Sequence, residues 1–185
     1  MAELLRERRS ALHGLSLPGK AGAAVVSEAG AAMRLIYRGA PEHVGQSFGV
    51  ALPVQPCRAA RSGERAALWL GPDEWLLIAA DADSSAVRRG LALALSGKTA
   101  ALVDVSHRSA ALIIAGPRAA DLLNAGCPLD LGLAEFPAGM CARTLLAKAE
   151  IILWRTAPEA FRLEAWRSFM PYVTGLLGEA ARGLD

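Results

Sequence analysis

The segment Asp104-Val105-Ser106-His107 brings a carboxylate, a hydroxyl and an imidazole to the end of an expected strand. A serine beside a histidine could serve nucleophilic catalysis, in which the imidazole takes the proton of the attacking hydroxyl. Adjacent residues of an extended strand point to opposite faces, so Ser106 and His107 should diverge. Asp and Ser side chains also bond readily to turn backbone. We therefore expect Asp104 or Ser106 to cap a turn rather than to act in catalysis.

A second candidate, Gly14-Leu15-Ser16-Leu17-Pro18-Gly19-Lys20-Ala21, has the glycine and lysine spacing of a phosphate-binding loop. Ala21 stands where such loops carry the hydroxyl that binds magnesium, no apolar strand precedes the segment, and Pro18 lies inside it. The Gly-x-Gly-x-x-Gly triplet of dinucleotide-binding folds does not occur in the sequence. We expect no nucleotide or dinucleotide cofactor in this chain.

The residue types that bind metals are few and scattered. The cysteines lack the short paired spacings of zinc and redox sites, and the histidines form no local cluster. We therefore expect no metal site and three buried, unpaired thiols. The cysteines are Cys57, Cys127 and Cys141, and the histidines are His13, His43 and His107.

One of the four tryptophans is a candidate for a protein interface. Large aromatic side chains on strands mostly fill the core, which is the expectation for Trp69, Trp75 and Trp154. Trp166 shares a strand face with charged residues, so alternation places it on the more polar side. Aromatic and arginine side chains are enriched where interfaces carry their binding energy. The interface candidates are Arg162, Trp166, Arg167 and Phe169.

Hydrophobic periodicity predicts the elements that carry these residues. Apolar residues that alternate with polar ones predict strands, and apolar residues three or four apart predict helices. The turn composition Gly71-Pro72-Asp73-Glu74 predicts a hairpin. The expected strands are residues 31–38, 66–70, 75–80, 100–105, 110–115, 143–146, 151–154 and 161–166. The expected helices are residues 41–50, 85–95, a segment after Gly116-Pro117, and a closing helix capped by Ser168 with Pro171 in its first turn.

These elements predict an α+β fold with mainly antiparallel sheets and interspersed helices. Strands joined by short turns favour antiparallel pairing, and the helices then cover one face. The expected organisation is an N-terminal leader over residues 1–20, a first α+β half over 21–97 and a second over 98–185, with the halves packed as one compact unit.

Composition excludes several classes of protein. The 185 residues are 53% apolar but only 5% aromatic, and the net charge of +2 is too small to indicate a polyanionic partner. The longest apolar stretches are far shorter than the roughly 20 residues of a membrane helix. Charged residues interrupt the first ten positions, where a secretory signal needs an apolar run. We expect a cytoplasmic protein without nucleic-acid or membrane partners.

Several ordered motifs resemble the gamma subunits of heterotetrameric sarcosine oxidase and, more distantly, the folate-binding aminomethyltransferase of the glycine cleavage system. Together they cover roughly residues 68–177. The motifs are Leu70-Gly71-Pro72-Asp73-Glu74-Trp75-Leu76-Leu77, Asp104-Val105-Ser106-His107-Arg108 with Gly116-Pro117-Arg118-Ala119-Ala120-Asp121-Leu122-Leu123, Phe136-Pro137-Ala138-Gly139 with Arg143-Thr144, and Phe161-Arg162-Leu163-Glu164 with Arg167-Ser168-Phe169.

The resemblance implies an accessory, non-catalytic gamma subunit with the first part of the aminomethyltransferase fold. It implies alpha, beta and delta subunits as partners, with FAD, FMN, NAD and tetrahydrofolate bound by the larger subunits and none by this chain. Such a complex oxidatively demethylates sarcosine to glycine, with hydrogen peroxide as a product and transfer of the one-carbon unit to tetrahydrofolate. No acidic residue of this chain maps onto the catalytic aspartate of the aminomethyltransferases.

Two other functions remain open at this point. A stand-alone tetrahydrofolate-binding module would use the region around Asp104 and Gly116, and it requires a deep pocket with aromatic stacking. An RNA-binding accessory would use the arginines, which equally reflect a preference for Arg over Lys throughout the chain.

Overall fold

A computed structural model gives the structure of the chain and describes residues 10–15, 17, 20–21 and 24–184. Most of the expected leader, residues 1–20, therefore lies outside the described residues. Ser16, Pro18 and Gly19 of the segment that resembles a phosphate-binding loop lie outside them too. Every helix in the described part of the chain is too short or too polar to cross a membrane.

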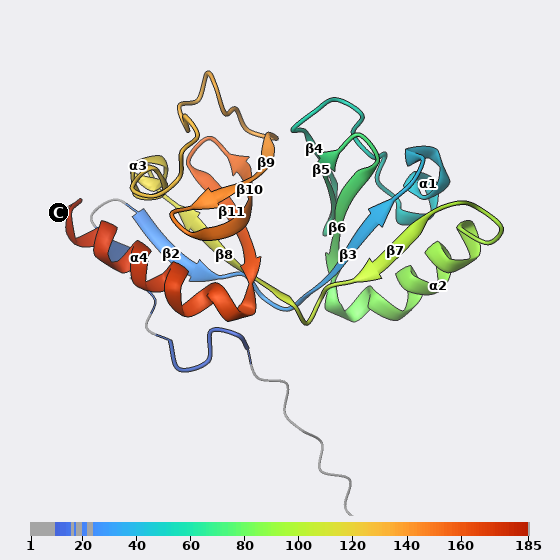
Figure 1. Cartoon of the computed structure of the whole chain (residues 1–185), viewed down its shortest axis with the longest axis horizontal. Coiled ribbons are helices and arrows are strands. Elements are labelled where there is room, and N and C mark those ends of the chain that lie inside the picture. Colours follow the sequence, from blue (N-terminus) through green and yellow to red (C-terminus); the bar gives the residue numbers. More distant parts are fainter. Residues whose placement is uncertain (1–9, 16, 18–19, 22–23, 185) are drawn as a thin grey trace, which may run out of the picture.

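The described strands form two antiparallel sheets that face each other, with helices on their outer sides (Figure 1). The first sheet has the order β1-β2-β8-β11-β10-β9, and the second has the order β4-β5-β6-β3-β7. In the first sheet the strands are β1 (Lys20–Ala21), β2 (Ala24–Glu28), β8 (Ser109–Ala115), β9 (Cys141–Leu146), β10 (Ala149–Ala157) and β11 (Ala160–Trp166). In the second they are β3 (Ala32–Arg38), β4 (Ala59–Ser62), β5 (Arg65–Gly71), β6 (Glu74–Ala80) and β7 (Ala101–Asp104).

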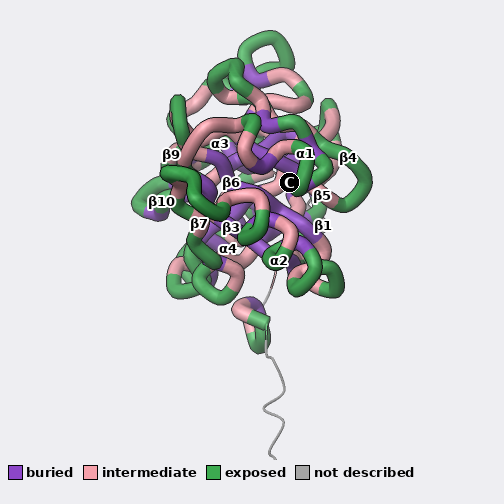
Figure 2. The backbone as a smooth tube through the Cα atoms, turned by 90° about the vertical axis from the view of Figure 1, so that its right-hand side faces the viewer, coloured by how far each residue is buried: buried purple, intermediate pink, exposed green. Residues whose placement is uncertain are grey.

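The helices cover the outer face of each sheet. Helices α3 (Ala119–Asn124) and α4 (Met170–Arg182) pack their apolar residues on the first sheet, around Leu112, Phe161 and Leu163. Helices α1 (Gly45–Phe48) and α2 (Ser84–Ala94) do the same on the second sheet. Three short 3-10 turns, η1 (Pro41–His43), η2 (Asp81–Asp83) and η3 (Arg167–Phe169), precede α1, α2 and α4. Figure 2 shows the resulting arrangement, with buried strands at the centre and exposed loops around them.

A third apolar layer lies between the two sheets. We call this layer the seam. Because its residues come from the inner faces of both sheets, it joins them into one packed unit. Backbone bonds add to the packing, since Cys141 N–H donates to the Cys57 carbonyl at 2.9 Å and Ala59 N–H donates to the Gly139 carbonyl at 2.8 Å. The buried apolar residues of the seam are Ala32, Ala66, Leu68, Leu76, Ile78, Val105, Cys141 and Trp154.

The chain crosses from one sheet to the other twice near the same place. The first crossing runs from β2 to β3 through residues 29–31, and the second runs from β7 to β8 through residues 105–108. Figure 1 shows the two connections side by side at one end of the sheets, opposite the end where β9 approaches β5. Because of these crossings, β2 belongs to the sheet formed mainly by the second half of the chain, and β7 belongs to the sheet formed by the first half.

The fold class expected from the sequence is confirmed: the chain is α+β, with antiparallel sheets and interspersed helices. The expected boundary at residues 97 and 98 does not coincide with the division between the sheets, because β7 pairs with β3 and not with β8. The separation into a leader and two packed halves stays a prediction about folding units, for which limited proteolysis is the measurement.

Most expected elements occur with small shifts at their ends, and the hairpin turn at residues 71–74 joins β5 and β6 as expected. The single helix expected over residues 41–50 is instead divided into η1 and the four-residue α1. Strands β1, β2 and β4 were not expected. Ser168 does not cap the closing helix, because α4 begins after Phe169 and no side chain caps it. Pro171 lies in the first turn of α4, where its missing N–H costs no helical bond.

All three cysteines are unpaired, but only two of them are buried. Cys141 lies at the start of β9, and burial raises the pKa of its thiol to about 12. Burial also raises the pKa of Cys127. Cys57 is partly exposed, which differs from the expectation of three buried thiols.

We expect iodoacetamide at pH 8 to modify Cys57 well before Cys127 and Cys141 in the folded chain, because alkylation requires an accessible thiolate. Mass spectrometry of peptides taken over time measures the three rates. Chemical unfolding should bring the three rates together. Equal rates in the folded chain would contradict the burial of Cys141.

Candidate functional site

Trp166 ends β11 and is exposed, with 43% of its surface accessible. The guanidinium carbon of Arg108 lies 5.3 Å from the centre of its ring, a cation–π contact. The ring of Phe169 lies 6.0 Å away, tilted by 37°. We call Arg108, Trp166, Arg167 and Phe169 the Trp166 patch. The other three tryptophans are buried or partly buried, as expected for core residues.

The turn between β7 and β8 holds the Trp166 patch in place. Arg167 N–H donates to the carbonyl of Arg108 at 2.8 Å, and its Nη1 donates to the carbonyl of His107 at 3.4 Å. The end of β11 and the start of η3 are therefore tied to residues 107–108. This long-range contact brings Arg108 against Trp166. Local sequence patterns had not identified Arg108 as an interface candidate.

Arg162 does not belong to the Trp166 patch, although it was expected to frame Trp166. Its side chain is only 15% exposed and bonds through Nε to Oε1 of Glu164 at 2.8 Å. Alternation places Arg162, Glu164 and Trp166 on one face, as expected, but that face is the seam and not solvent. Only Trp166, at the end of the strand, reaches the surface.

Glu164 is shared by two arginines from different sheets. Its Oε2 accepts from Nε of Arg34 on β3 at 2.5 Å, and its Oε1 accepts from Arg162. The side chains of Arg34 and Glu164 are 4% and 3% exposed. The three residues form a buried cluster, which we call the Arg34 triad, and it links the two sheets across the seam.

Ser106 and Asp104 serve the backbone, as the sequence predicted. Asp104 accepts the N–H of Ser106 at 2.9 Å, and the Ser106 hydroxyl accepts the N–H of Arg34 at 2.9 Å. Burial alone would raise the pKa of Asp104, but bonds from Ser106 and the nearby Arg88 outweigh it and hold that pKa below its usual value. The hydroxyl of Ser106 is thus used in joining β3 to the turn after β7.

In the described part of the chain, no three His, Cys, Asp or Glu side chains gather closely enough to hold a metal ion.

Comparison with known proteins places these features in a family. The sequence model of the sarcosine oxidase, gamma subunit family matches residues 37–182. The gamma subunit of sarcosine oxidase from Arthrobacter sp is 34% identical over 147 residues, which cover 76% of this chain and 71% of that protein. The corresponding subunit from Corynebacterium sp. (strain P-1) is 33% identical over 138 residues, covering 74% and 67% of the two chains.

Solved structures show the same relationship. A chain of the heterotetrameric sarcosine oxidase from Corynebacterium sp. U-96, solved in complex with pyrrole 2-carboxylate, superposes with a TM-score of 0.88 at 29% identity, covering 96% of both chains. Aminomethyltransferase T of the glycine cleavage system from Bartonella henselae has a TM-score of 0.67 at 14% identity. This chain spans about half of that protein (49%), and the likeness concerns the fold alone.

Proposed function

The chain belongs to the sarcosine oxidase gamma subunit family, and on this basis we propose that it is an accessory subunit of a heterotetrameric sarcosine oxidase. The likeness to a chain of a heterotetrameric sarcosine oxidase, over 96% of both chains, carries this proposal.

We propose that the partners are alpha, beta and delta subunits, and that the larger subunits bind FAD, FMN, NAD and tetrahydrofolate. The complex then oxidatively demethylates sarcosine to glycine, releases hydrogen peroxide and passes the one-carbon unit to tetrahydrofolate. A cytoplasmic location and the lack of nucleic-acid and membrane partners stay predictions.

The role proposed for this chain within the complex is structural. The Ser106 hydroxyl, the nucleophile that the sequence brings beside a histidine, is bonded to the backbone of Arg34. A serine held in this way supports a turn and is poorly placed to attack a substrate.

We propose that the Trp166 patch contacts a larger subunit. Trp166 is the exposed tryptophan of the described chain, and two arginines and a phenylalanine surround it. Tryptophan and arginine are the residues most enriched at the energetic centres of interfaces. An exposed indole with these neighbours is more typical of a protein interface than of a surface that stays in contact with solvent.

A stand-alone tetrahydrofolate-binding module receives less support. The cavity beside Arg34, close to Asp104, holds about 170 Å³, and Ala, Ser and Gly dominate its lining. A larger hollow of about 480 Å³ along residues 41–54 has no aromatic residue in its lining. Pockets for ligands of drug size usually measure about 300–1,000 Å³ and carry aromatic walls. Titration calorimetry of the isolated chain with tetrahydrofolate tests this alternative directly.

The proposed function is tested by co-expressing the tagged chain with alpha, beta and delta subunits. We expect all four chains to co-purify in equal amounts and to produce hydrogen peroxide from sarcosine. The tagged chain alone should be colourless and should not oxidise sarcosine. A flavin absorption spectrum of the isolated chain, or an active complex that assembles without it in normal yield, would contradict the proposal.

A further inference from the structure

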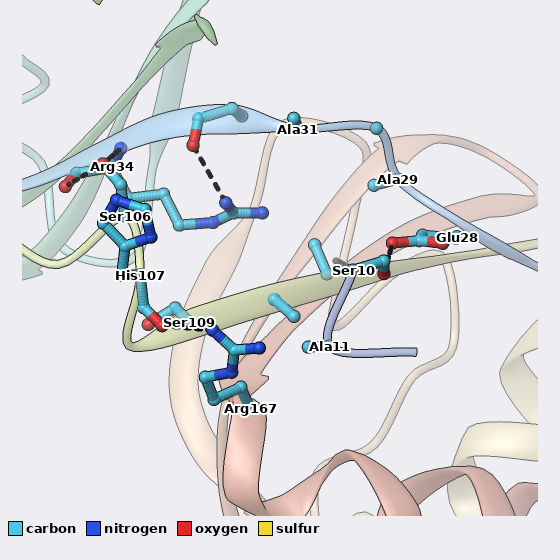
Figure 3. Close-up of a pocket in the computed structure, with 14 residues that line it drawn as sticks. Ser10, Ala11, Glu28, Ala29, Ala31, Arg34, Ser106, His107, Ser109 and Arg167 are labelled. Atoms are coloured by element: carbon cyan, nitrogen blue, oxygen red, sulfur yellow. Dashed lines mark hydrogen bonds between the residues drawn. The ribbon is translucent and has the colours of Figure 1, made fainter. Parts of the chain in front are cut away.

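A cavity of about 170 Å³ lies where the chain crosses between the two sheets. Residues 28–32, 106–107 and 109–111, in and beside the two crossings, line most of it, together with Arg34 and Arg167 (Figure 3). Small residues explain the space, since six alanines and one glycine stand among the lining residues. The two sheets diverge here, and short side chains leave the gap between them unfilled.

Arg34 reaches into this cavity although its side chain is 4% exposed. Its Nε donates to Glu164, and its Nη1 donates to the carbonyl of Ala32 at 3.1 Å. Figure 3 shows the guanidinium of Arg34 extending into the space between the crossings. Among the bonds of Arg34 to described residues, none uses Nη2. One face of a buried cation is thus available to a ligand.

The charges around the cavity leave an excess of positive charge. Arg34 and Arg162 share one carboxylate, that of Glu164, so the Arg34 triad carries one uncompensated positive charge. Arg167 adds a second cation at the edge of the cavity. Glu28 supplies a carboxylate to the lining and accepts a bond from the hydroxyl of Ser10. The lining therefore contains cations together with a single carboxylate.

We propose that this cavity binds a small zwitterionic amino acid, with its carboxylate on Arg34 and Arg167 and its ammonium group toward Glu28. A guanidinium matches a carboxylate through two parallel hydrogen bonds, which favours a carboxylate over a spherical anion. Glu28 disfavours a ligand with two negative charges, such as phosphate. The cavity volume, that of roughly five to six liquid water molecules, limits the ligand to an amino acid with a small side chain. This inference does not depend on the proposed function.

The test is titration calorimetry of the full chain with glycine, acetate, methylamine and inorganic phosphate at constant ionic strength. We expect saturable binding of glycine, weaker binding of acetate, and none of methylamine. Phosphate should bind more weakly than glycine. Acetate keeps the carboxylate and lacks the ammonium group, so it separates the contribution of Arg34 and Arg167 from that of Glu28.

Two variants assign the two ends of the ligand, and a third is the control. Arg167→Gln should weaken glycine binding by at least about tenfold, because it removes one charge-assisted contact. Glu28→Gln should abolish the preference for glycine over acetate. Arg182→Gln, which removes an exposed arginine of α4 paired with Glu179, should leave binding unchanged. Unfolding midpoints of the variants show whether each one is folded.

Several outcomes would overturn the inference. The absence of saturable glycine and acetate binding at millimolar concentrations excludes the site. Equal binding to Arg167→Gln and Arg182→Gln places the ligand elsewhere. Phosphate binding as tight as glycine binding identifies a general anion site and excludes the amino-acid assignment.

Discussion

Replacing Glu164 by Ala is expected to destabilise the folded chain by about 3–5 kcal/mol. The substitution leaves Arg34 and Arg162 inside the seam without the carboxylate that both of them bind. The cost of burying an unpaired charge exceeds the modest net gain from an ion pair. Removing only the carboxylate should therefore destabilise the fold far more than replacing all three charged side chains by apolar ones. Urea unfolding followed by circular dichroism measures the change.

Two further variants separate charge burial from a general loss of packing. The triple variant Arg34→Met, Glu164→Leu, Arg162→Met removes every charge of the triad, and it should lose much less stability than Glu164→Ala. Glu179→Ala breaks an exposed pair with Arg182 and should change stability by no more than about 0.5 kcal/mol. If Glu164→Ala cost less than about 1 kcal/mol, water or local rearrangement would be screening the two arginines, and the triad would not be a buried charge cluster.

Trp166→Ala is expected to weaken association with the larger subunits by about 2 kcal/mol or more, which is about thirtyfold in affinity. A hot-spot tryptophan loses its burial against the partner when truncated, together with the cation–π contact to Arg108. The isolated variant should remain folded, because the ring is 43% exposed and lies at the end of its strand. Co-purification of the four chains, followed by an affinity titration, is the measurement.

Leu93→Ala is the matched control for this prediction. Leu93 is a large apolar residue of α2, 78% exposed on the far side of the second sheet from the Trp166 patch. Its truncation should leave assembly unchanged. Recovery of the full complex with Trp166→Ala at the wild-type level would show that the indole is free surface, and unfolding of the isolated variant would show that it belongs to the core.

Local patterns predicted most elements and their faces. The alternation of Phe161 and Leu163 with Arg162 and Glu164 placed β11 and its two faces, since side-chain direction in a strand is set by the backbone. The hairpin at residues 71–74 and the amphipathic helix α2 were predicted for the same reason. The ordered motifs between residues 68 and 177 indicated the family, which the family match confirmed.

Partners distant in the chain could not be predicted in this way. Strand β7 was expected in the second half, yet it pairs with β3, because β3 offers it a free sheet edge that no local signal marks. Arg108 reaches Trp166 from a turn 58 residues earlier in the chain, and Arg34 meets Glu164 across 130 residues. Such contacts depend on how two sheets pack, and packing depends on shape over the whole chain.

The sequence by itself determined the periodicity of each element, the α+β class and the family, because these follow from local backbone geometry and from ordered motifs. Only the tertiary structure decided which polar residues are buried. The charged face of β11 suggested an exposed surface, but a second sheet covers it and turns Arg162 and Glu164 into a buried cluster with Arg34. Burial is a property of what lies opposite a side chain, and the alternation of residues along a strand carries no information about that neighbour.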